Sequence, residues 1–216
     1  GLSLPWVGSA PWPPEINGVA MSLKRMVDGL LARGHRVPLI RPRQHTGDTP
    51  RRDGPLREVL SLGIPIPKYG SLRVGLPAKQ KLVRLWTLER PDLVHLVTEG
   101  PLGWSAMAAA RKLKLPATSD FRTNFDAYSA HYGIGWLKRP ITAYLRRFHN
   151  LGQATYVPTR ALQLQLTACG YRNVEVVARG VDTRLFSPTR RSSALREAWG
   201  VGERDLVVCF VSRLAP

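Results

Sequence analysis

A glycine turn directly before a helix-like segment is the first stretch of the sequence that could bind a ligand. The residues Trp-Pro-Pro-Glu-Ile-Asn-Gly occupy positions 12–18, and helix-forming residues with apolar spacing follow. A helix N-terminus presents free N–H groups and the positive end of the helix dipole, which suit a phosphate or a carboxylate. Gly18 would let such an anion approach the backbone because it has no Cβ, and Asn17 before it is a candidate contact for a sugar or an acceptor. The alternative is a plain capping turn, since the stretch matches neither G-x-G-x-x-G nor a P-loop.

A second loop of this kind spans 98–103, where Thr-Glu-Gly-Pro-Leu-Gly follows the apolar stretch Leu-Val-His-Leu-Val. A carboxylate at the carboxyl end of a strand can accept hydrogen bonds from sugar hydroxyls, which makes Glu99 a candidate binding residue. Equally, Glu99 could serve only to cap the helix that follows it.

The densest group of polar and aromatic residues lies between 119 and 133. Aromatic rings interleaved with hydrogen-bonding groups suit a sugar, which has apolar faces and hydroxyl edges. The same mixture suits the stacked bases of a single-stranded nucleic acid, or it could be an amphipathic segment with an exposed polar side. The candidate binding residues of this group are Arg122, Asn124 and Asp126.

Arg213 follows the last apolar stretch, and an arginine there could either pair with a phosphate through two hydrogen bonds or lie free on the surface. The histidines are scattered at spacings that match no zinc motif, and no G-x-S-x-G sequence supports a hydrolase triad. The two cysteines, Cys169 and Cys209, form no CxxC pair and lie among apolar residues. We therefore expect both to be buried, reduced thiols.

Helix-like and strand-like segments alternate along the chain and would position these loops. Apolar spacing and glycine stops predict a helix that starts after Gly18 and ends at Gly34, and others over 78–89, 101–113, 135–150, 160–169 and 193–200. Apolar runs predict strands over 36–40, 93–97, 116–121, 154–158, 173–178 and 205–212.

For two further segments the sequence predicts no helix or strand. Residues 1–17 show no clean period, and 41–57 read as a long exposed loop. The alternation of helices and strands predicts an α/β fold, namely a Rossmann-like parallel sheet with helices on both faces. Ligands of such sheets bind at the carboxyl ends of the strands, which is where the candidate loops lie.

The formal net charge of +17 over 216 residues favours anionic partners, namely nucleic acid, acidic lipid or phosphorylated small molecules. A coding bias toward arginine is the alternative explanation. No stretch of about 18 apolar residues could span a membrane, and no charged and apolar leader suggests secretion. We therefore expect a cytoplasmic protein.

Six stretches, taken in their order, resemble glycosyltransferase family 4. They are PPEINGVA, RGH, PDLVHLVTEGPLG, TSDFRTNF, ARGVDTRLFSP and VVCFVSRLAP, and together they span nearly the whole chain. Within the family, the chain looks most similar to bacterial enzymes that transfer a hexose, often mannose, to lipid or glycan acceptors. The resemblance implies half of a GT-B fold, in which one Rossmann-like domain binds mainly the acceptor and a second binds mainly the nucleotide sugar.

The resemblance also implies roles for single residues. Gly18 matches the glycine loop that approaches the donor phosphates, and Arg213 matches the arginine that pairs with the diphosphate. Arg122 stands where the family commonly has a histidine that contacts the donor sugar, so it could contact an anion instead. The family transfers sugar with retention and without a metal or other cofactor, because positive groups stabilise the leaving diphosphate. We assign no catalytic residue.

These observations together predict an acceptor-binding domain over 1–185, and a linker plus the first strand of a donor-binding domain over 186–216. On this interpretation the chain is a fragment that is inactive by itself. The full enzyme would transfer a hexose, such as mannose, from a nucleotide sugar to a lipid or glycan acceptor with retention.

Two partner hypotheses remain at this stage. The segment 136–149 has Trp136, Ile141 and Phe148 beside four basic residues, so it could dock on the anionic inner face of a membrane or simply pack on the sheet. The competing class of protein is a non-catalytic basic module that binds RNA or another polyanion. We consider nucleic acid the weaker candidate, because the sequence has no RNA-binding signature.

Overall fold

The computed structural model describes residues 1–8, 18–66, 69–122 and 138–210. The chain separates into two compact units, Gly1–Arg179 and Gly180–Pro216, and each is described by itself. The domain boundary predicted at residue 185 stays a prediction, because compact units found from contacts need not coincide with domains.

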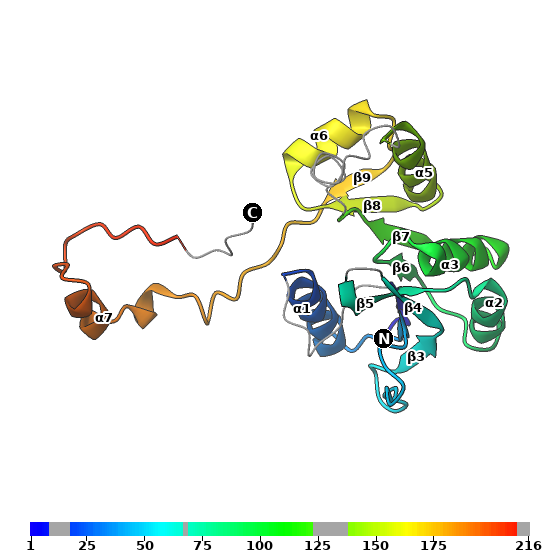
Figure 1. The fold of residues 1–216 in the computed structure, drawn as a ribbon, viewed down its shortest axis with the longest axis horizontal. Helices are drawn as coiled ribbons and strands as arrows, with labels where there is room; N and C mark the ends of the chain where they lie inside the picture. Colours follow the sequence, from blue (N-terminus) through cyan, green and yellow to red (C-terminus); the bar gives the residue numbers. More distant parts are fainter. Residues whose placement is uncertain (9–17, 67–68, 123–137, 211–216) are drawn as a thin grey trace. The chain divides into compact units, whose positions relative to one another are not determined.

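A parallel sheet forms the centre of the first unit (Figure 1). Within the described residues it has seven strands in the order β3-β2-β1-β6-β7-β8-β9, and each pairs in parallel with its neighbours. The strands are β1 (Trp6–Val7), β2 (Leu39–Pro42), β3 (Glu58–Ser61), β6 (Val94–Leu96), β7 (Ala117–Asp120), β8 (Ala154–Val157) and β9 (Val174–Val176). Strands β4 (Gly63–Ile66) and β5 (Tyr69–Gly75) form a separate antiparallel hairpin. The predicted Rossmann-like sheet is confirmed.

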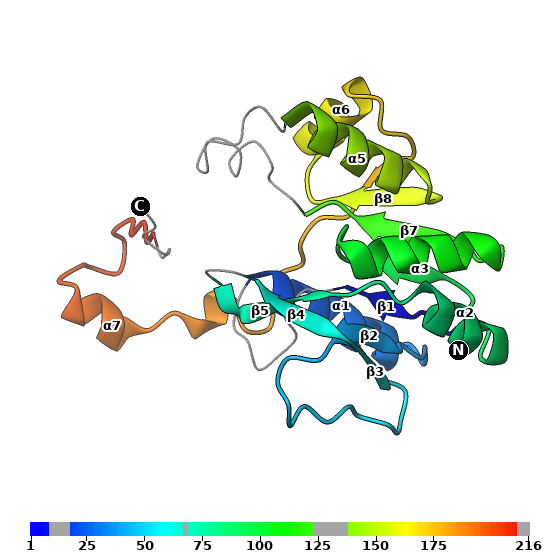
Figure 2. The ribbon, with the colours of Figure 1, turned by 45° about the vertical axis from the view of Figure 1, so that its right-hand side comes forward.

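Helices cover both faces of this sheet (Figures 1 and 2). They are α1 (Gly18–Ala32), α2 (Lys79–Leu88), α3 (Pro101–Lys112), α5 (Lys138–Asn150) and α6 (Arg160–Ala168). On one face, Leu23 and Val27 of α1 belong to a cluster with Trp6 of β1. On the other face, α2, α3 and α5 contribute to a larger cluster that contains Val7 of β1 and the fully buried Phe148. Because successive side chains of a strand point to opposite faces, β1 contributes to both cores.

The helix ends follow the sequence signals. Gly34 and Gly170 lie just beyond α1 and α6 with φ of 78° and 86°, the left-handed conformation in which glycine ends helices at no steric cost. The Thr159 hydroxyl accepts a hydrogen bond from the backbone N–H of Leu162 at 3.2 Å, so it caps the N-terminus of α6.

Strand β1 is a feature that the sequence did not predict. The N–H of Trp6 donates to the carbonyl of Pro38 at 2.8 Å, and the carbonyl of Val7 accepts from the N–H of Val97 at 2.8 Å. Both edges of the strand are therefore paired, which makes it central. A strand that is buried on both faces need not alternate polar and apolar residues, and Pro5 and Gly8 interrupt the apolar run further.

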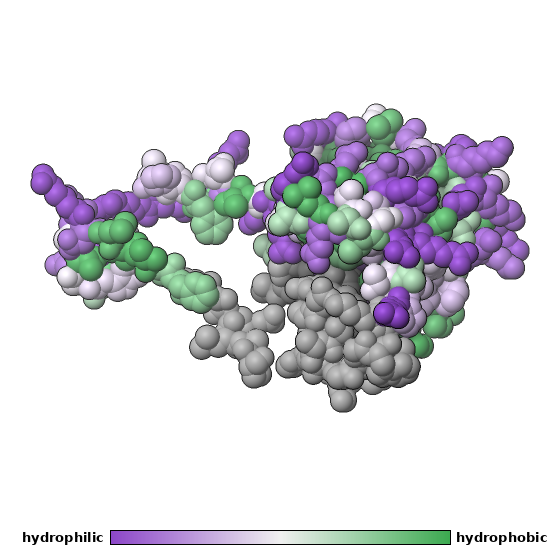
Figure 3. Space-filling view, turned by 90° about the horizontal axis from the view of Figure 1, so that it is seen from above, coloured by the Kyte–Doolittle hydropathy of each residue, from purple (hydrophilic) through white to green (hydrophobic). Residues whose placement is uncertain are grey.

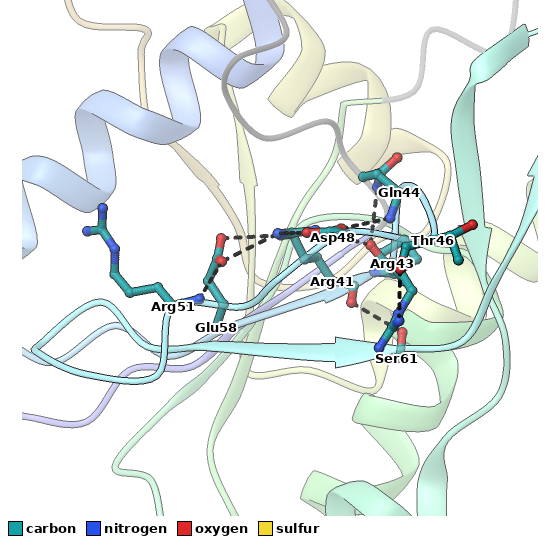
Figure 4. A network of polar contacts seen from close by, with 9 residues as sticks. Arg41, Arg43, Gln44, Thr46, Asp48, Arg51, Glu58 and Ser61 are labelled. Atoms are coloured by element: carbon teal, nitrogen blue, oxygen red, sulfur yellow. Dashed lines mark hydrogen bonds and ion pairs between the residues drawn. The ribbon is translucent and has the colours of Figure 1, made fainter.

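The loop predicted over 41–57 is less exposed than expected, because Arg41 belongs to β2 and is buried. Its guanidinium lies 2.6 Å from a carboxylate oxygen of Asp48 and 3.2 Å from one of Glu58, the first residue of β3 (Figure 4). The backbone N–H of Arg51 also donates to the Glu58 carboxylate, at 3.0 Å. A buried arginine needs such carboxylate partners to offset its lost hydration. The sequence predicted neither β3 nor this ion pairing, and Arg41 and Asp48 were placed in a solvated loop because polar and turn-forming residues surround them.

The second unit has little regular structure within residues 180–210. A short 3-10 helix, η2 (Pro188–Arg190), precedes the α-helix α7 (Ser193–Ala198), and the Ser192 hydroxyl caps α7. The strand predicted over 205–212 is wrong for its described part, because residues up to 210 form no strand. Leu206 and Phe210 are 91% and 86% exposed there. A buried strand requires pairing neighbours, and the described part of this unit provides none.

The prediction of buried cysteines is wrong. Cys169 and Cys209 are both free and exposed. Cys169 is the C-cap residue of α6, and Cys209 belongs to the unpaired stretch just described. Apolar sequence neighbours indicate burial only where a residue also lies on a packed face, and neither thiol does.

The ion pair under the loop after β2 generates a stability prediction. The hydrogen bond from Arg41 lowers the pKa of Asp48 from 3.8 to about 2. The stability that the pair contributes is therefore present above pH 3.8 and is lost as the pH falls toward about 2. Asp48→Asn should lower the free energy of unfolding at pH 7, and its difference from the wild type should shrink as the solution is acidified.

Urea unfolding at several pH values measures this difference. Asp53→Asn is the matched control, since Asp53 is an exposed aspartate of the same loop. It should leave the free energy of unfolding nearly unchanged throughout. A difference for Asp48→Asn that stays constant with pH would contradict the ion pair.

Candidate functional site

The order of the strands reverses its direction at β1 and β6, which we call the switch point. From β1 the chain passes through α1 to β2 on one side, whereas from β6 it passes through α3 to β7 on the other side. Open α/β sheets bind their ligands outside the carboxyl ends of the strands at such a reversal. A ligand-binding site is therefore expected at the switch point.

The two strand ends at the switch point are in contact. Gly8 follows β1, and a Cβ built on it would lie 2.9 Å from the Cβ of Val97 and 3.3 Å from the hydroxyl of Thr98. Helix α1 begins at Gly18, as the sequence predicts, and α3 begins at Pro101. Both helices therefore start close in sequence to a strand that ends at the switch point.

Glu99 lies at the carboxyl end of β6, where the sequence places it. Its carboxylate Oε1 is 3.2 Å from Nε2 of His149 in α5, and its backbone carbonyl accepts a hydrogen bond from the Tyr144 hydroxyl at 2.5 Å. The N-cap residue of α3 is Gly100, so Glu99 is not the N-cap residue. Instead, two side chains of α5 contact Glu99: His149 contacts its carboxylate and Tyr144 contacts its backbone carbonyl.

A buried polar chain continues from His149 into the core. Nδ1 of His149 lies 2.7 Å from the hydroxyl of Ser119 in β7, which in turn lies 3.5 Å from the hydroxyl of Thr155 in β8. An ionised Glu99 can only accept hydrogen bonds, so Nε2 of His149 donates to it. In the tautomer that carries the proton on Nε2, Nδ1 accepts from the Ser119 hydroxyl, so both ring nitrogens have a partner.

Aromatic rings surround His149. The centroids of Phe121, Phe148 and Tyr171 lie 5.2 Å, 5.1 Å and 6.0 Å from its ring centroid. Burial in this group raises the pKa of the Tyr171 hydroxyl to about 12. The buried imidazole is therefore packed against three aromatic rings.

A second polar group lies on the opposite face of the sheet. Arg122 donates from Nε and Nη2 to one carboxylate oxygen of Asp120, at 2.8 Å and 2.5 Å. Burial alone would raise the pKa of the Asp120 carboxyl, but His95 and Arg122 beside it hold that pKa below its ordinary value. Nδ1 of His95 lies 2.9 Å from the Thr118 hydroxyl. Arg122 is thus a cation anchored at the carboxyl end of β7.

The predicted site residues divide into three groups. Glu99 and Arg122 lie at the carboxyl ends of the adjacent strands β6 and β7, although their contacts are on opposite faces of the sheet. Gly18 starts α1. The remaining predicted residues lie outside the part of the chain that the structure describes: Asn17, Asn124, Asp126 and Arg213.

The sequence missed the residues that hold this site together. Ser119, Asp120 and Thr118 are all buried in β7, and His149 is buried in α5. Buried polar groups require partners, so three polar residues within a buried strand could have indicated a network beneath the surface. No comparable signal indicates that His149 binds Glu99, 50 residues before it.

The four described α-helices of the first unit other than α1 carry an unusual surface charge. Helices α2, α3, α5 and α6 contain no acidic residue. Seen from above, hydrophilic residues make up most of the described surface of the first unit (Figure 3). Phe148, which the sequence suggested for membrane contact, is fully buried and packs in the core. The apolar side of α5 therefore packs on the sheet, and its exposed side includes Arg139 and Arg147.

A parallel sheet with polar groups at its switch point defines a Rossmann-like ligand-binding domain. The chain belongs to glycosyltransferase family 4, since the model of Glycosyltransferase Family 4 matches residues 16–185. A GDP-mannose-dependent alpha-mannosyltransferase of Mycobacterium tuberculosis is 33% identical over 211 residues, which cover 94% of this chain and 54% of that protein.

Two other known proteins are informative. A GDP-mannose-dependent alpha-(1-6)-phosphatidylinositol monomannoside mannosyltransferase of Mycolicibacterium smegmatis is 27% identical over 216 residues, or 95% of this chain and 51% of that protein. The structure of a sucrose-phosphate synthase from Thermosynechococcus elongatus superposes with a TM-score of 0.63 at 11% identity, over 94% of this chain and 53% of that one. That likeness shows the fold alone. The chain spans about half the length of the curated relatives it matches.

The contact between the start of α3 and the loop before it generates a prediction. A Cβ on Gly103 would lie 2.0 Å from the carbonyl oxygen of Thr98, so Gly103→Ala must displace the loop that carries Glu99. The free energy of unfolding should fall by about 1–3 kcal/mol, the usual cost of overpacking. Denaturant unfolding measures this change.

Gly100→Ala is the matched control for Gly103→Ala. A Cβ on Gly100 meets nothing within 4 Å, and the residue has an ordinary φ of −70°. This variant should lose less than about 1 kcal/mol, the cost of alanine at an N-cap. Equal losses in the two variants would show that Gly103 does not set the position of the loop.

Proposed function

We propose that the complete protein transfers a hexose, with mannose as the first candidate, from a nucleotide sugar to a lipid or glycan acceptor. The observation that carries the proposal is the match of residues 16–185 to glycosyltransferase family 4. The sheet supports it, because the switch point carries the Glu99 carboxylate, a group that suits sugar hydroxyls. The printed names of the two mycobacterial relatives favour GDP-mannose as the donor and, in one case, a lipid acceptor.

The roles proposed for single residues follow the family resemblance. The backbone at Gly18 and the guanidinium of Arg213 would contact the donor phosphates. The residues proposed to line the sugar or acceptor region are Asn17, Glu99, Arg122, Asn124 and Asp126. Transfer would retain the configuration at the anomeric carbon, and it would need neither a metal ion nor another cofactor, because cationic groups would stabilise the leaving diphosphate.

Contact with a membrane is a further part of the proposal. Among the described residues, no helix is long and apolar enough to cross a bilayer. We propose a cytoplasmic protein that touches the inner face of the membrane through the exposed arginines of α5, Arg139 and Arg147. Because Phe148 is buried, this contact would be electrostatic and would weaken as salt is added.

The transfer reaction can be tested with the complete protein that carries this chain. Incubation with radiolabelled GDP-mannose and a bacterial lipid extract should give a labelled lipid, and addition of EDTA should leave the rate unchanged. UDP-glucose should be the poorer donor. The isolated residues 1–216 should give no labelled product, because they span about half of the relatives.

The competing hypothesis, a non-catalytic module that binds RNA or another polyanion, predicts a different result. A complete protein that transfers no sugar from any nucleotide sugar, yet binds RNA tightly and with a dependence on RNA length, would overturn the proposal. Filter binding at rising salt measures that affinity, since phosphate contacts give a steep salt dependence.

Sedimentation with lipid vesicles tests the membrane contact. The complete protein should bind vesicles of phosphatidylglycerol and phosphatidylcholine, should release them as salt rises, and should bind pure phosphatidylcholine poorly. Replacing Arg139 and Arg147 together with glutamine should weaken binding, by about fivefold per charge. The control replaces Arg36 and Arg52, two exposed arginines outside α5, and removes the same charge. An equal loss in both variants would show that the contact is not specific to α5.

A further inference from the structure

Glu99 is a carboxylate that the fold holds in a nearly buried place. Its side chain is 12% exposed, and the side chain of its partner His149 is 0% exposed. An ionised group at such a position loses most of its hydration, which is costly unless hydrogen bonds compensate. The Glu99 side chain keeps part of its exposure, whereas His149, which contacts it, is completely buried.

The series of hydrogen bonds behind Glu99 fixes the orientation of the His149 ring. Ser119 is 0% exposed, so its hydroxyl cannot act as a nucleophile on an external substrate, and the series Ser119–His149–Glu99 is not a hydrolase triad. The hydroxyl instead binds Nδ1 of the ring at 2.7 Å and leaves Nε2 for Glu99 at 3.2 Å. The series begins at Ser119 in the sheet and ends at the Glu99 carboxylate.

The residues packed around the His149 ring prevent it from adopting other orientations. Three aromatic side chains lie within 6.0 Å of His149, centroid to centroid, so a rotated ring would have to displace a packed neighbour. Tyr144 of the same helix fixes the backbone carbonyl of Glu99 at 2.5 Å. Helix α5 therefore determines the position of the whole residue, both at its backbone and at its carboxylate.

We infer that His149 is a positioning residue, which holds the Glu99 carboxylate in one orientation at the switch point. The oriented carboxylate accepts a hydrogen bond from a hydroxyl of the sugar or acceptor, and this second part rests on the proposed function. His149 itself touches no substrate. Its contribution is that the accepting oxygen is already in place before the hydroxyl arrives, which lowers the cost of ordering it.

Two amide substitutions at His149 separate positioning from packing. The side-chain nitrogen of glutamine can occupy the place of Nε2, whereas that of asparagine can occupy the place of Nδ1. His149→Gln therefore keeps a donor for Glu99 and loses the bond to Ser119. His149→Asn keeps a partner for Ser119 and loses the bond to Glu99. Both variants bury one amide in the same aromatic surroundings, so each is the control for the other.

The first measurement is kcat/KM for sugar transfer by the complete protein. His149→Asn should lose about ten- to a hundredfold, the value of a hydrogen bond to a charged group, and His149→Gln should keep most of the activity. In a Glu99→Gln background, His149→Asn should add little further loss. Equal losses in the two His149 variants, or full additivity with Glu99→Gln, would overturn the inference in favour of a packing role.

The second measurement needs no turnover. In the 15N NMR spectrum of histidine-labelled complete protein, His149 should show a protonated Nε2 and an unprotonated Nδ1, and Glu99→Gln should shift the Nε2 resonance. A resonance that Glu99→Gln leaves unmoved would overturn the inference even if the enzyme is active. A shifted resonance in a protein that transfers no sugar would support the positioning of Glu99 and count against the proposed function alone.

Discussion

The hydrogen bonds on both edges of β1 are the constraint on which the rest of the structure depends. The strand is two residues long, yet it pairs with β2 on one edge and with β6 on the other. These pairings bring the carboxyl ends of β1 and β6 together, so that Gly8 lies against Val97 and Thr98. This central strand connects the two parts of the site, because it packs against α1 and pairs with β6, which leads into the loop that carries Glu99. The close approach also explains a glycine at position 8, since the space for a side chain is already occupied.

The alternation of side chains along β7 distributes the chemistry of the site over two faces. Ser119 points toward α5 and joins the series that ends in the Glu99 carboxylate. Asp120 points toward α1 and anchors Arg122, whose Nη2 lies 4.0 Å from the sulfur of Met26. Two consecutive residues of one strand therefore support an acceptor of hydrogen bonds on one face and a cation on the other. Arg122 is paired with Asp120, and Glu99 with His149, so each charged group has its own partner.

The sequence predicts most of the fold, because hydrophobic period and glycine stops are local signals. The predicted helices of the first unit match α1, α2, α3, α5 and α6 to within a few residues. The misses share a physical cause. Strand β1, the buried Arg41 with its two carboxylates, and the unpaired stretch before residue 210 all depend on partners distant in the chain. For the site, loop position predicted Glu99 and Arg122, but pairing across 50 residues, as between Glu99 and His149, leaves no local pattern.

The absence of acidic residues from α2, α3, α5 and α6 has a consequence for how these helices keep their shape. Helix α1 carries an i,i+4 pair between Lys24 and Asp28, 2.5 Å apart, but none of the other four can form such a pair within itself. Their helical conformation is secured from the inside, in α5 by Phe148 and His149 against the sheet. The helical conformation of α5 therefore does not depend on the charges of Arg139 and Arg147 on its exposed side. A change of charge at these two positions should therefore leave the contact between His149 and Glu99 on the inner side intact.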